Sequence, residues 1–197
     1  MSYSQVNQDT WVLSKISKPG FFLDIGAHDG IYYSNSKLLE ENGWSGLCVE
    51  ANPDTIPTLK KNRTSKVVEK AIGDKISMMN FQTNGPVSTV SESGNVEVPM
   101  ITFKELFEFY KVPSYIDYMS IDIEGYEYEA LSKFPFDTHT IGIITVEHNK
   151  YLHGTENKEK IFNLLTSNGY VRTHNNVSHE GYEFEDWYMH NSLNTKN

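Results

Sequence analysis

The sequence predicts one α/β domain with a mainly parallel β-sheet. Two observations support this fold class: short apolar runs alternate with stretches of helical periodicity, and the first apolar run leads through a glycine-containing turn into a helix. The 197 residues suffice for one sizeable core, and no internal repeat or linker divides them. We therefore expect a single domain over residues 1–197.

The first half of the chain predicts alternating helices and strands. Asn42-Gly43 ends one helix and Asn52-Pro53 begins the next, because Gly suits a helix end, Asn caps a helix start and Pro fits the first turn. In chain order we expect a helix over 4–16, a strand over 21–25, a helix over 33–42, a strand over 46–50, a helix over 53–62 and a strand at 67–68.

The second half continues this alternation and closes with a hairpin. A capping box at Thr102–Glu105 begins a helix whose apolar face contains Phe103, Leu106 and Phe107. The other expected elements are a strand over 76–82, a Ser-, Asn- and Gly-rich loop over 84–95 that is a candidate lid, a strand over 118–121, a helix ending near Lys133, a strand over 141–146, a helix over 156–167, and an antiparallel pair over 170–175 and 183–190.

The turn over residues 24–30 carries the strongest functional signal. A dinucleotide-binding turn has the pattern G-x-G-x-x-G, but here Ala27 and His28 follow Gly26, and Asp24 places a carboxylate at the strand end. A carboxylate repels a pyrophosphate and suits a cationic group such as a sulfonium. The turn therefore favours S-adenosylmethionine over NAD. The other interpretation is an ordinary strand–helix turn in which the Asp caps the helix.

A second acid, Glu50, ends the next apolar run. It follows Gly30 by about 20 residues, the spacing at which such folds place an acid on ribose hydroxyls. The ordered pair of acids strengthens the prediction of a nucleoside-containing cofactor.

Four strongly predicted central strands end in acids, namely Asp24, Glu50, Asp122 and Glu147. The carboxyl ends of parallel strands meet at one edge of the sheet, where ligands of this architecture bind. Carboxylates that converge there repel one another and call for a compensating ligand or metal ion. Each acid taken alone is equally consistent with a solvated side chain or a helix cap.

Composition limits the classes of partner. The formal net charge of −9 comes without a basic block, so we expect no avid binding to nucleic acid. No apolar stretch reaches membrane-spanning length and no signal-peptide pattern is present at the N-terminus, so we expect a cytoplasmic protein without a membrane partner. The single cysteine, Cys48, falls in a predicted buried strand.

From about Ser4 to Tyr188 the sequence resembles the FkbM family of S-adenosylmethionine-dependent methyltransferases. The matching elements are Ser4-Gln5, Gln8-Asp9, the turn over 24–30, Ser34-Asn35, Gly43-Trp44, residues 49–53, Ala71-Ile72-Gly73, residues 122–127 and Glu147-His148. The resemblance implies a class I methyltransferase Rossmann-like fold: a three-layer sandwich with a mostly parallel seven-stranded sheet of order 3-2-1-4-5-7-6. It also implies O-methylation of a hydroxyl on a sugar, glycan or natural-product-like molecule. His28 departs from the Asn that the family often has.

The resemblance and the two acids together give a set of expected cofactor contacts. These residues are Asp24, Gly26, Ala27, His28, Gly30, Ser34, Asn35, Glu50, Ala51, Ala71, Ile72 and Asp122. The expected partner is a small-molecule or glycan acceptor. A protein that binds S-adenosylmethionine without turning it over is the alternative, and the sequence does not reveal the acceptor or the oligomeric state.

An alcohol is a poor nucleophile at neutral pH, so methyl transfer to a hydroxyl needs a general base or a Lewis-acidic metal ion. We expect His148 to be the base, since imidazole titrates near neutral pH, with Asp122 as a second catalytic residue. Asp122, Glu124 and Glu147 offer oxygen ligands for Mg²⁺ or Ca²⁺, by analogy with metal-dependent sugar methyltransferases of related fold. The sequence favours the base over the metal because it offers a His at a strand end but no dense acidic cluster such as consecutive aspartates.

Overall fold

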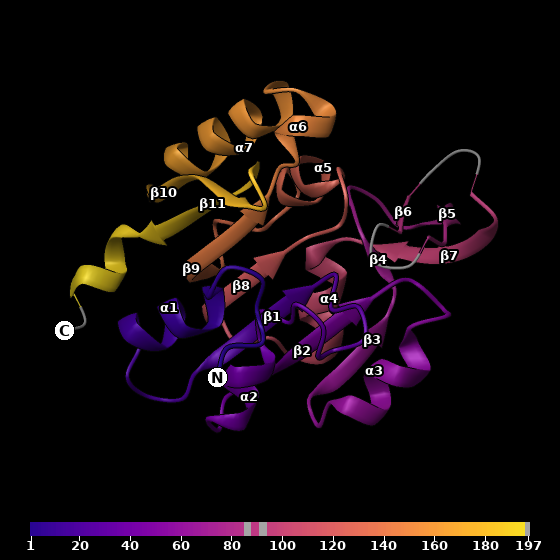
Figure 1. Ribbon diagram of the computed structural model, residues 1–197, viewed down its shortest axis with the longest axis horizontal. Helices are drawn as coiled ribbons and strands as arrows, with labels where there is room; N and C mark the ends of the chain where they lie inside the picture. Colours follow the sequence, from indigo (N-terminus) through magenta and orange to yellow (C-terminus); the bar gives the residue numbers. More distant parts are fainter. Residues whose placement is uncertain (85–87, 91–93, 196–197) are drawn as a thin grey trace.

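A seven-stranded sheet forms the centre of the protein in the computed structural model, which describes residues 1–84, 88–90 and 94–195 (Figure 1). Its strands are β1 (Phe21–Ile25), β2 (Ser45–Glu50), β3 (Lys66–Glu69), β8 (Tyr115–Ile121), β9 (Thr140–Glu147), β10 (Tyr170–His179) and β11 (Tyr182–His190). The spatial order is β3-β2-β1-β8-β9-β11-β10, and β11 runs antiparallel to both of its neighbours. Numbered within this sheet alone, the order is 3-2-1-4-5-7-6, which confirms the predicted fold class.

Helices cover both faces of this sheet. The helices on one face are α1 (Gln8–Lys15), α2 (Lys37–Glu41) and α3 (Ile56–Asn62), and those on the other are α4 (Phe103–Tyr110), α5 (Glu127–Leu131) and α7 (Glu156–Ser167). Two short elements, α6 (Lys150–His153) and the 3₁₀ helix η1 (Asn191–Thr195), complete the helical part. Coverage on both faces explains why β9 is buried continuously from Ile141 to Glu147 rather than at every second residue.

Side chains of the central strands point alternately to the two faces. Leu23 and Ile25 of β1 pack in the cluster that contains α4, α5 and α7, whereas Phe22 packs with α1, α2 and α3.

None of the helices in the described part of the chain is long and apolar enough to cross a bilayer.

A second, smaller sheet lies beyond the carboxyl ends of β2 and β3 (Figure 1). Its strands are β4 (Ala71–Ile72), β5 (Ser77–Gln82), β6 (Thr89–Val90) and β7 (Val96–Ile101). The strand predicted over 76–82 is present as β5, but β7 was not predicted and β6 interrupts the predicted loop over 84–95. Residues 85–87 and 91–93 of that loop, and so half of the candidate lid, lie outside the described residues.

Three of the predicted helices are shorter than expected at their N-terminal ends. The first begins at Gln8 because Asn7 takes a left-handed conformation with φ 67°. The second begins at Lys37 because Tyr33, with φ 52°, leaves the helical region and forms an isolated β-bridge with Ser4. The third begins at Ile56 instead of residue 53. The helix over 156–167 has the predicted bounds.

Asp186 on β11 connects the closing hairpin to the rest of the domain. Its carboxylate lies 3.0 Å from Arg172 Nη1, 3.4 Å from Lys158 Nζ and 3.5 Å from His148 Nε2, and it accepts a hydrogen bond from the Asn176 amide. Burial alone raises the pKa of Asp186, but His148, the Asn176 amide and the Lys158 charge outweigh burial and lower the pKa to about 2.

This lowered pKa gives the stability a defined dependence on pH. An unfolded Asp has a pKa of about 3.9, so the contribution of Asp186 is complete above roughly pH 5 and is lost as the pH falls toward 2. We expect Asp186→Asn to remove about 1 kcal/mol of the acid-dependent loss between pH 6 and 3, measured by urea unfolding. Asn in place of the exposed Asp54 is the matched control. An unchanged pH slope in the Asp186 variant would contradict the assignment.

Candidate functional site

A cavity of about 360 Å³ lies at the carboxyl ends of β1, β2, β8 and β9. The glycine turn after β1, the segment over 32–35, the second sheet and the tip of the β10–β11 hairpin form its walls. Of the residues predicted to bind cofactor or metal, those that line the cavity are Asp24, Gly26, Ala27, His28, Ser34, Asn35, Glu50, Ala51, Ala71, Ile72, Asp122, Glu124 and Glu147. Gly30 and His148 are not among the lining residues.

Gly26 allows the turn to contact the end of β8. Its φ is 90°, and a Cβ atom at this position would lie 1.7 Å from the carbonyl oxygen of Asp122. The amides of Gly26 and Ala27 both donate to the carbonyl of Val49, at 2.9 and 3.0 Å. The turn is thus fixed between the ends of β2 and β8. Gly30 is needed for packing instead, since a Cβ there would meet Arg63 and Leu59.

Asp24 is buried and bonded to protein groups. Ser36 donates its hydroxyl to this carboxylate, and Arg63 Nη1 lies 3.7 Å from it. Burial raises the pKa of Asp24, while the Arg63 charge opposes that rise. Arg63, 5% exposed, also lies 3.1 Å from Glu40. The positive charge beside Asp24 therefore comes from a buried arginine, which lies outside the cavity lining and pairs with this lining carboxylate.

Glu50 ties the turn to the loop after β2. One carboxylate oxygen accepts from the His28 amide and the other from the Asn52 amide, both at 2.7 Å. Burial raises the pKa of Glu50, and these amide bonds oppose the rise. A carboxylate oxygen accepts more than one hydrogen bond, so Glu50 keeps acceptor capacity for a ligand in the cavity.

Two further lining residues have buried polar atoms without hydrogen-bond partners in the described part of the chain. These atoms are His28 Nδ1 and Asn35 Oδ1. Asn35 is held in place because its Nδ2 donates to Ser120 Oγ at 2.8 Å. Buried polar atoms in native proteins nearly always have partners, so this wall suits a polar ligand.

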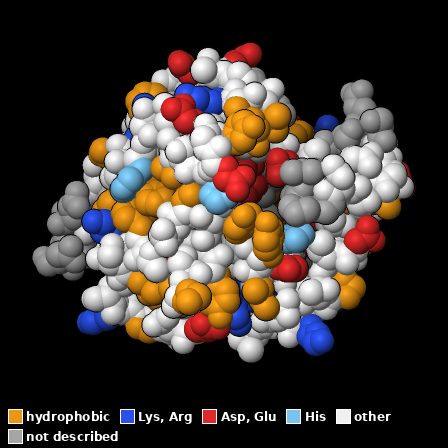
Figure 2. Space-filling view, viewed as in Figure 1, with side chains coloured by type: hydrophobic (Ala, Val, Ile, Leu, Met, Phe, Trp, Pro, Cys, Tyr) orange, Lys and Arg blue, Asp and Glu red, His pale blue; other side chains and the backbone are white. Residues whose placement is uncertain are grey.

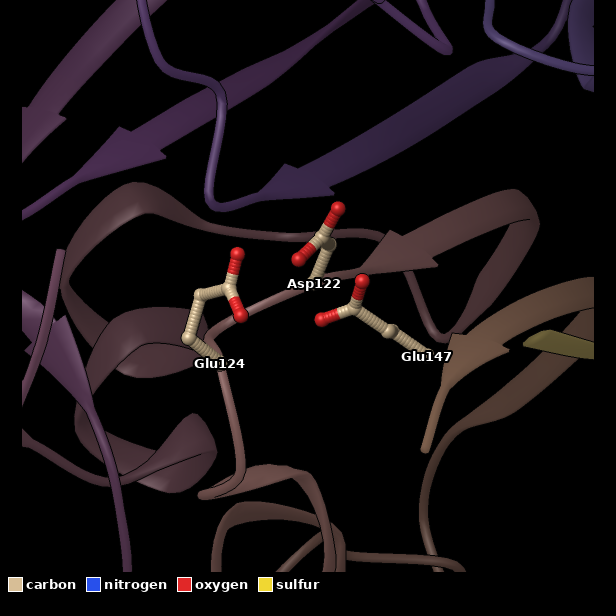
Figure 3. Close-up of side chains that lie close together, drawn as sticks. All are labelled: Asp122, Glu124 and Glu147. Carbon is tan, nitrogen blue, oxygen red and sulfur yellow. The ribbon is translucent and has the colours of Figure 1, made fainter. Parts of the chain in front are cut away.

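Asp122, Glu124 and Glu147 converge on one point of the cavity. One oxygen from each lies within 4.8 Å of the others, and Figure 3 shows their carboxyl groups facing a common space. Burial raises the pKa of Glu124 to about 8, with further contributions from Asp122 and Glu127. Burial and the charges of Asp122 and Glu124 also raise the pKa of Glu147. The cluster thus carries mutual repulsion that a cation would relieve.

Asn149 adds a neutral oxygen beside these acids. It is 2% exposed and adopts a left-handed conformation with φ 42°. Its Nδ2 donates to Glu124 Oε2 at 3.0 Å, while its Oδ1 has no partner among the described residues. Glu147 Oε2 is likewise buried without a partner there. Sequence reasoning missed Asn149, although it stands two residues after a predicted strand-terminal acid.

His148 does not reach the cavity, which corrects the expectation that it is the base. Successive side chains of a strand point to opposite faces, and His148 follows Glu147, which faces the cavity. The ring of His148 is 2% exposed; its Nδ1 accepts from the Lys150 amide, and its Nε2 faces Asp186. His148 therefore supports the hairpin, whereas the other predicted catalytic residue, Asp122, does line the cavity.

The close approach at Gly26 can be tested by comparison with Gly43. Both glycines have positive φ, 90° and 85°, but a Cβ at Gly43 would have Pro19 Cγ as its nearest neighbour, at 3.7 Å. We expect Gly43→Ala to cost about 1–2 kcal/mol of unfolding free energy from backbone strain. Gly26→Ala should cost roughly 1–3 kcal/mol more because of the collision with Asp122. Equal losses in urea unfolding would show that the close approach is unimportant.

The chain is similar to known methyltransferases in sequence and in structure. The sequence profile of the Methyltransferase FkbM domain matches residues 24–172, more than half of the chain. No curated protein matches it significantly.

Three solved structures illustrate the likeness in fold. A methyltransferase FkbM from Methylobacillus flagellatus superposes with a TM-score of 0.60 at 14% identity, over 87% of this chain and 44% of that one. A TehB-like S-adenosylmethionine-dependent methyltransferase from Corynebacterium glutamicum gives 0.54 at 11% identity, over 94% and 87% of the two chains. Human methyltransferase 10 domain containing protein gives 0.55 at 14% identity, over 94% and 81%.

The present chain spans less than half the length of the Methylobacillus protein. At identities this low the structural superpositions show the fold alone, whereas the match to the domain profile shows the family. The chain belongs to the FkbM family of methyltransferases and has the class I methyltransferase fold.

Proposed function

We propose that the protein transfers a methyl group from S-adenosylmethionine to a hydroxyl of a small-molecule or glycan acceptor. Family membership supports the methyltransferase activity. The observation that carries the rest is one cavity whose lining includes Glu50, the glycine turn and three converging carboxylates. Carboxylates suit an oxygen acceptor because a hydroxyl must lose its proton during transfer.

The residues around the turn fit the cofactor. Glu50 would hold ribose hydroxyls through its remaining acceptor capacity, and Ile72 and Phe81 offer apolar contact for a flat base in the same cavity. The unpartnered Nδ1 of His28 and Oδ1 of Asn35 supply further polar contacts. When bound, S-adenosylmethionine supplies an electrophilic methyl group on a sulfonium and leaves as S-adenosylhomocysteine.

The acid cluster is the candidate site for activation of the acceptor hydroxyl. Asp122, Glu124 and Glu147, with Oδ1 of Asn149, present the hard oxygen donors that Mg²⁺ and Ca²⁺ prefer. We propose that these residues hold a divalent cation, which would lower the pKa of an acceptor hydroxyl. Asp122 would accept the proton of the acceptor hydroxyl, and Glu124 and Glu147 would orient that hydroxyl.

Glu50 provides the test of cofactor binding. We expect micromolar affinity for S-adenosylmethionine, and Glu50→Ala should weaken it by roughly 1–3 kcal/mol through loss of charge-assisted hydrogen bonds. The matched control is Glu69→Ala, since Glu69 pairs with Glu50 in register on β3 but is half-exposed and outside the cavity. Isothermal titration calorimetry measures both variants. Equal affinities in the two would remove Glu50 from the cofactor site.

The cation is tested by chelation and by binding. We expect EDTA to abolish acceptor-dependent formation of S-adenosylhomocysteine and Mg²⁺ or Ca²⁺ to restore it. Independently of activity, either cation should raise the melting temperature of the wild type and of Glu183→Gln, whose exposed acid lies outside the cavity, but not that of Glu124→Gln.

Two other outcomes would change the proposal. Transfer that survives EDTA, with no shift in melting temperature, would leave Asp122 acting alone as the base. In that case Asp122→Asn should lower kcat by roughly 10²–10⁴-fold. Cofactor binding without turnover on any hydroxyl acceptor would instead indicate a non-catalytic binding protein.

A further inference from the structure

Four partly exposed tyrosines belong to the same cavity as the converging acids. Tyr32, Tyr33, Tyr151 and Tyr182 all line the cavity, and between 42% and 58% of each residue is exposed. They come from three separate places in the chain: the segment after the glycine turn, α6, and the start of β11. Figure 2 shows acidic side chains near the middle of this face with hydrophobic and histidine side chains beside them.

The tyrosines form two pairs of tilted rings in contact. The rings of Tyr32 and Tyr33 have centroids 4.0 Å apart, and those of Tyr151 and Tyr182 are 5.0 Å apart. His179 at the hairpin tip meets the ring of Tyr33 edge-on at 5.7 Å. Aromatic rings are usually buried or in contact with a partner, so a cavity bordered by exposed rings on separate elements is typical of a binding surface.

Backbone strain concentrates around the same cavity. The described residues include eight non-glycine residues with positive φ, and five of them line it: His28, Tyr33, Glu124, Asn149 and Glu180. A left-handed conformation is costly for a residue with a Cβ atom, and such strain tends to gather at functional sites. At Tyr33 the bridge to Ser4 holds the strained backbone in place.

The charge of the cavity walls limits what can bind. Lys70 is the only Lys or Arg among the lining residues that the structure describes. The acids that line the cavity are Asp24, Glu50, Asp122, Glu124, Glu147 and Glu180. Asp24 is compensated by Arg63, and Lys150, which precedes Tyr151, is already paired with Glu183 outside the lining. With a divalent cation held by the acid cluster, the five lining acids other than Asp24 still outnumber the positive charges of Lys70 and the cation, so an acceptor with a phosphate, sulfate or carboxylate near its reacting hydroxyl would be repelled.

We propose that the Tyr32/Tyr33 pair and the Tyr151/Tyr182 pair form the acceptor subsite and select a saturated, polyhydroxylated ring without negative charge. The flat aromatic faces contact the C–H groups on one face of such a ring, and the carboxylates bind its hydroxyls. This inference rests on the proposed transfer of methyl to a hydroxyl. Beyond that proposal, it names the residues that bind the acceptor and predicts that negatively charged acceptors are excluded.

The experiment measures acceptor binding without turnover. Saturation-transfer NMR is recorded on the protein with S-adenosylhomocysteine and a panel of neutral methyl glycosides, each beside its uronate counterpart. We expect at least one neutral glycoside to bind and its uronate to bind at least about tenfold more weakly. Tyr182→Ala and Tyr151→Ala should weaken the neutral ligand by about tenfold or more, whereas Tyr→Phe at either position should retain binding.

The matched control is Phe109→Ala, which removes an exposed ring on α4 (76% exposed) outside the cavity. The inference is wrong if no neutral glycoside binds, if the uronates bind equally well, or if the tyrosine-to-alanine variants behave like Phe109→Ala. Calorimetry with S-adenosylmethionine separates this result from failure of the proposed function. Wild-type protein that binds no cofactor contradicts the proposed function, while normal cofactor affinity with unaltered glycoside binding in the tyrosine variants contradicts the acceptor subsite alone.

Discussion

The contact between the glycine turn and the end of β8 is the constraint on which the site depends. Gly26 has no Cβ atom, so its backbone lies against the Asp122 carbonyl while its amide bonds to Val49. A larger residue would separate the ends of β1 and β8. The His28 amide would then no longer meet Glu50, and Asp122 would move relative to Glu147. One backbone approach therefore fixes the turn, with its His28–Glu50 hydrogen bond, against the strand end that carries Asp122.

The protein treats its buried acids in two opposite ways. His148, the Asn176 amide and the Lys158 charge lower the pKa of Asp186 to about 2 despite its burial. Among the described residues the carboxylates of Glu124 and Glu147 have no positively charged partner, and burial raises the pKa of both. A buried carboxylate whose charge is balanced by its neighbours stabilises the fold. A buried carboxylate without such neighbours is a candidate binding group for a cation or substrate. A raised pKa alone does not identify a functional acid, because burial also raises the pKa of Glu185, which accepts from Gln8 and Trp187 outside the cavity; Glu124 and Glu147 differ in that they converge on the cavity.

The sheet order followed from the resemblance to the FkbM family, whereas local patterns and one packing rule predicted the alternation of helices and strands and the convergence of the acids. The helix over 156–167 kept its predicted bounds, and Asp122 and Glu147 met because parallel strands end at one edge. The errors came from contacts distant in sequence. The residues next to Asp24 in the sequence do not indicate that Arg63 lies beside it. Whether His148 faces the cavity depends on the residue at which β9 ends. Of the second sheet only β5 was predicted, and the two-residue strand Thr89–Val90 is too short to show a periodicity.

The β10–β11 hairpin has a consequence for how this domain can diversify. Its tip reaches the cavity from the edge of the sheet, while the turn after β1 reaches it from the centre. The two segments are anchored separately, one through Asp186 and the other through Gly26 and Glu50. Substitutions in the hairpin turn can therefore remodel one half of the cavity without disturbing the other. Descendants of such a scaffold are free to exchange the molecule they modify while the donor of the transferred group stays the same.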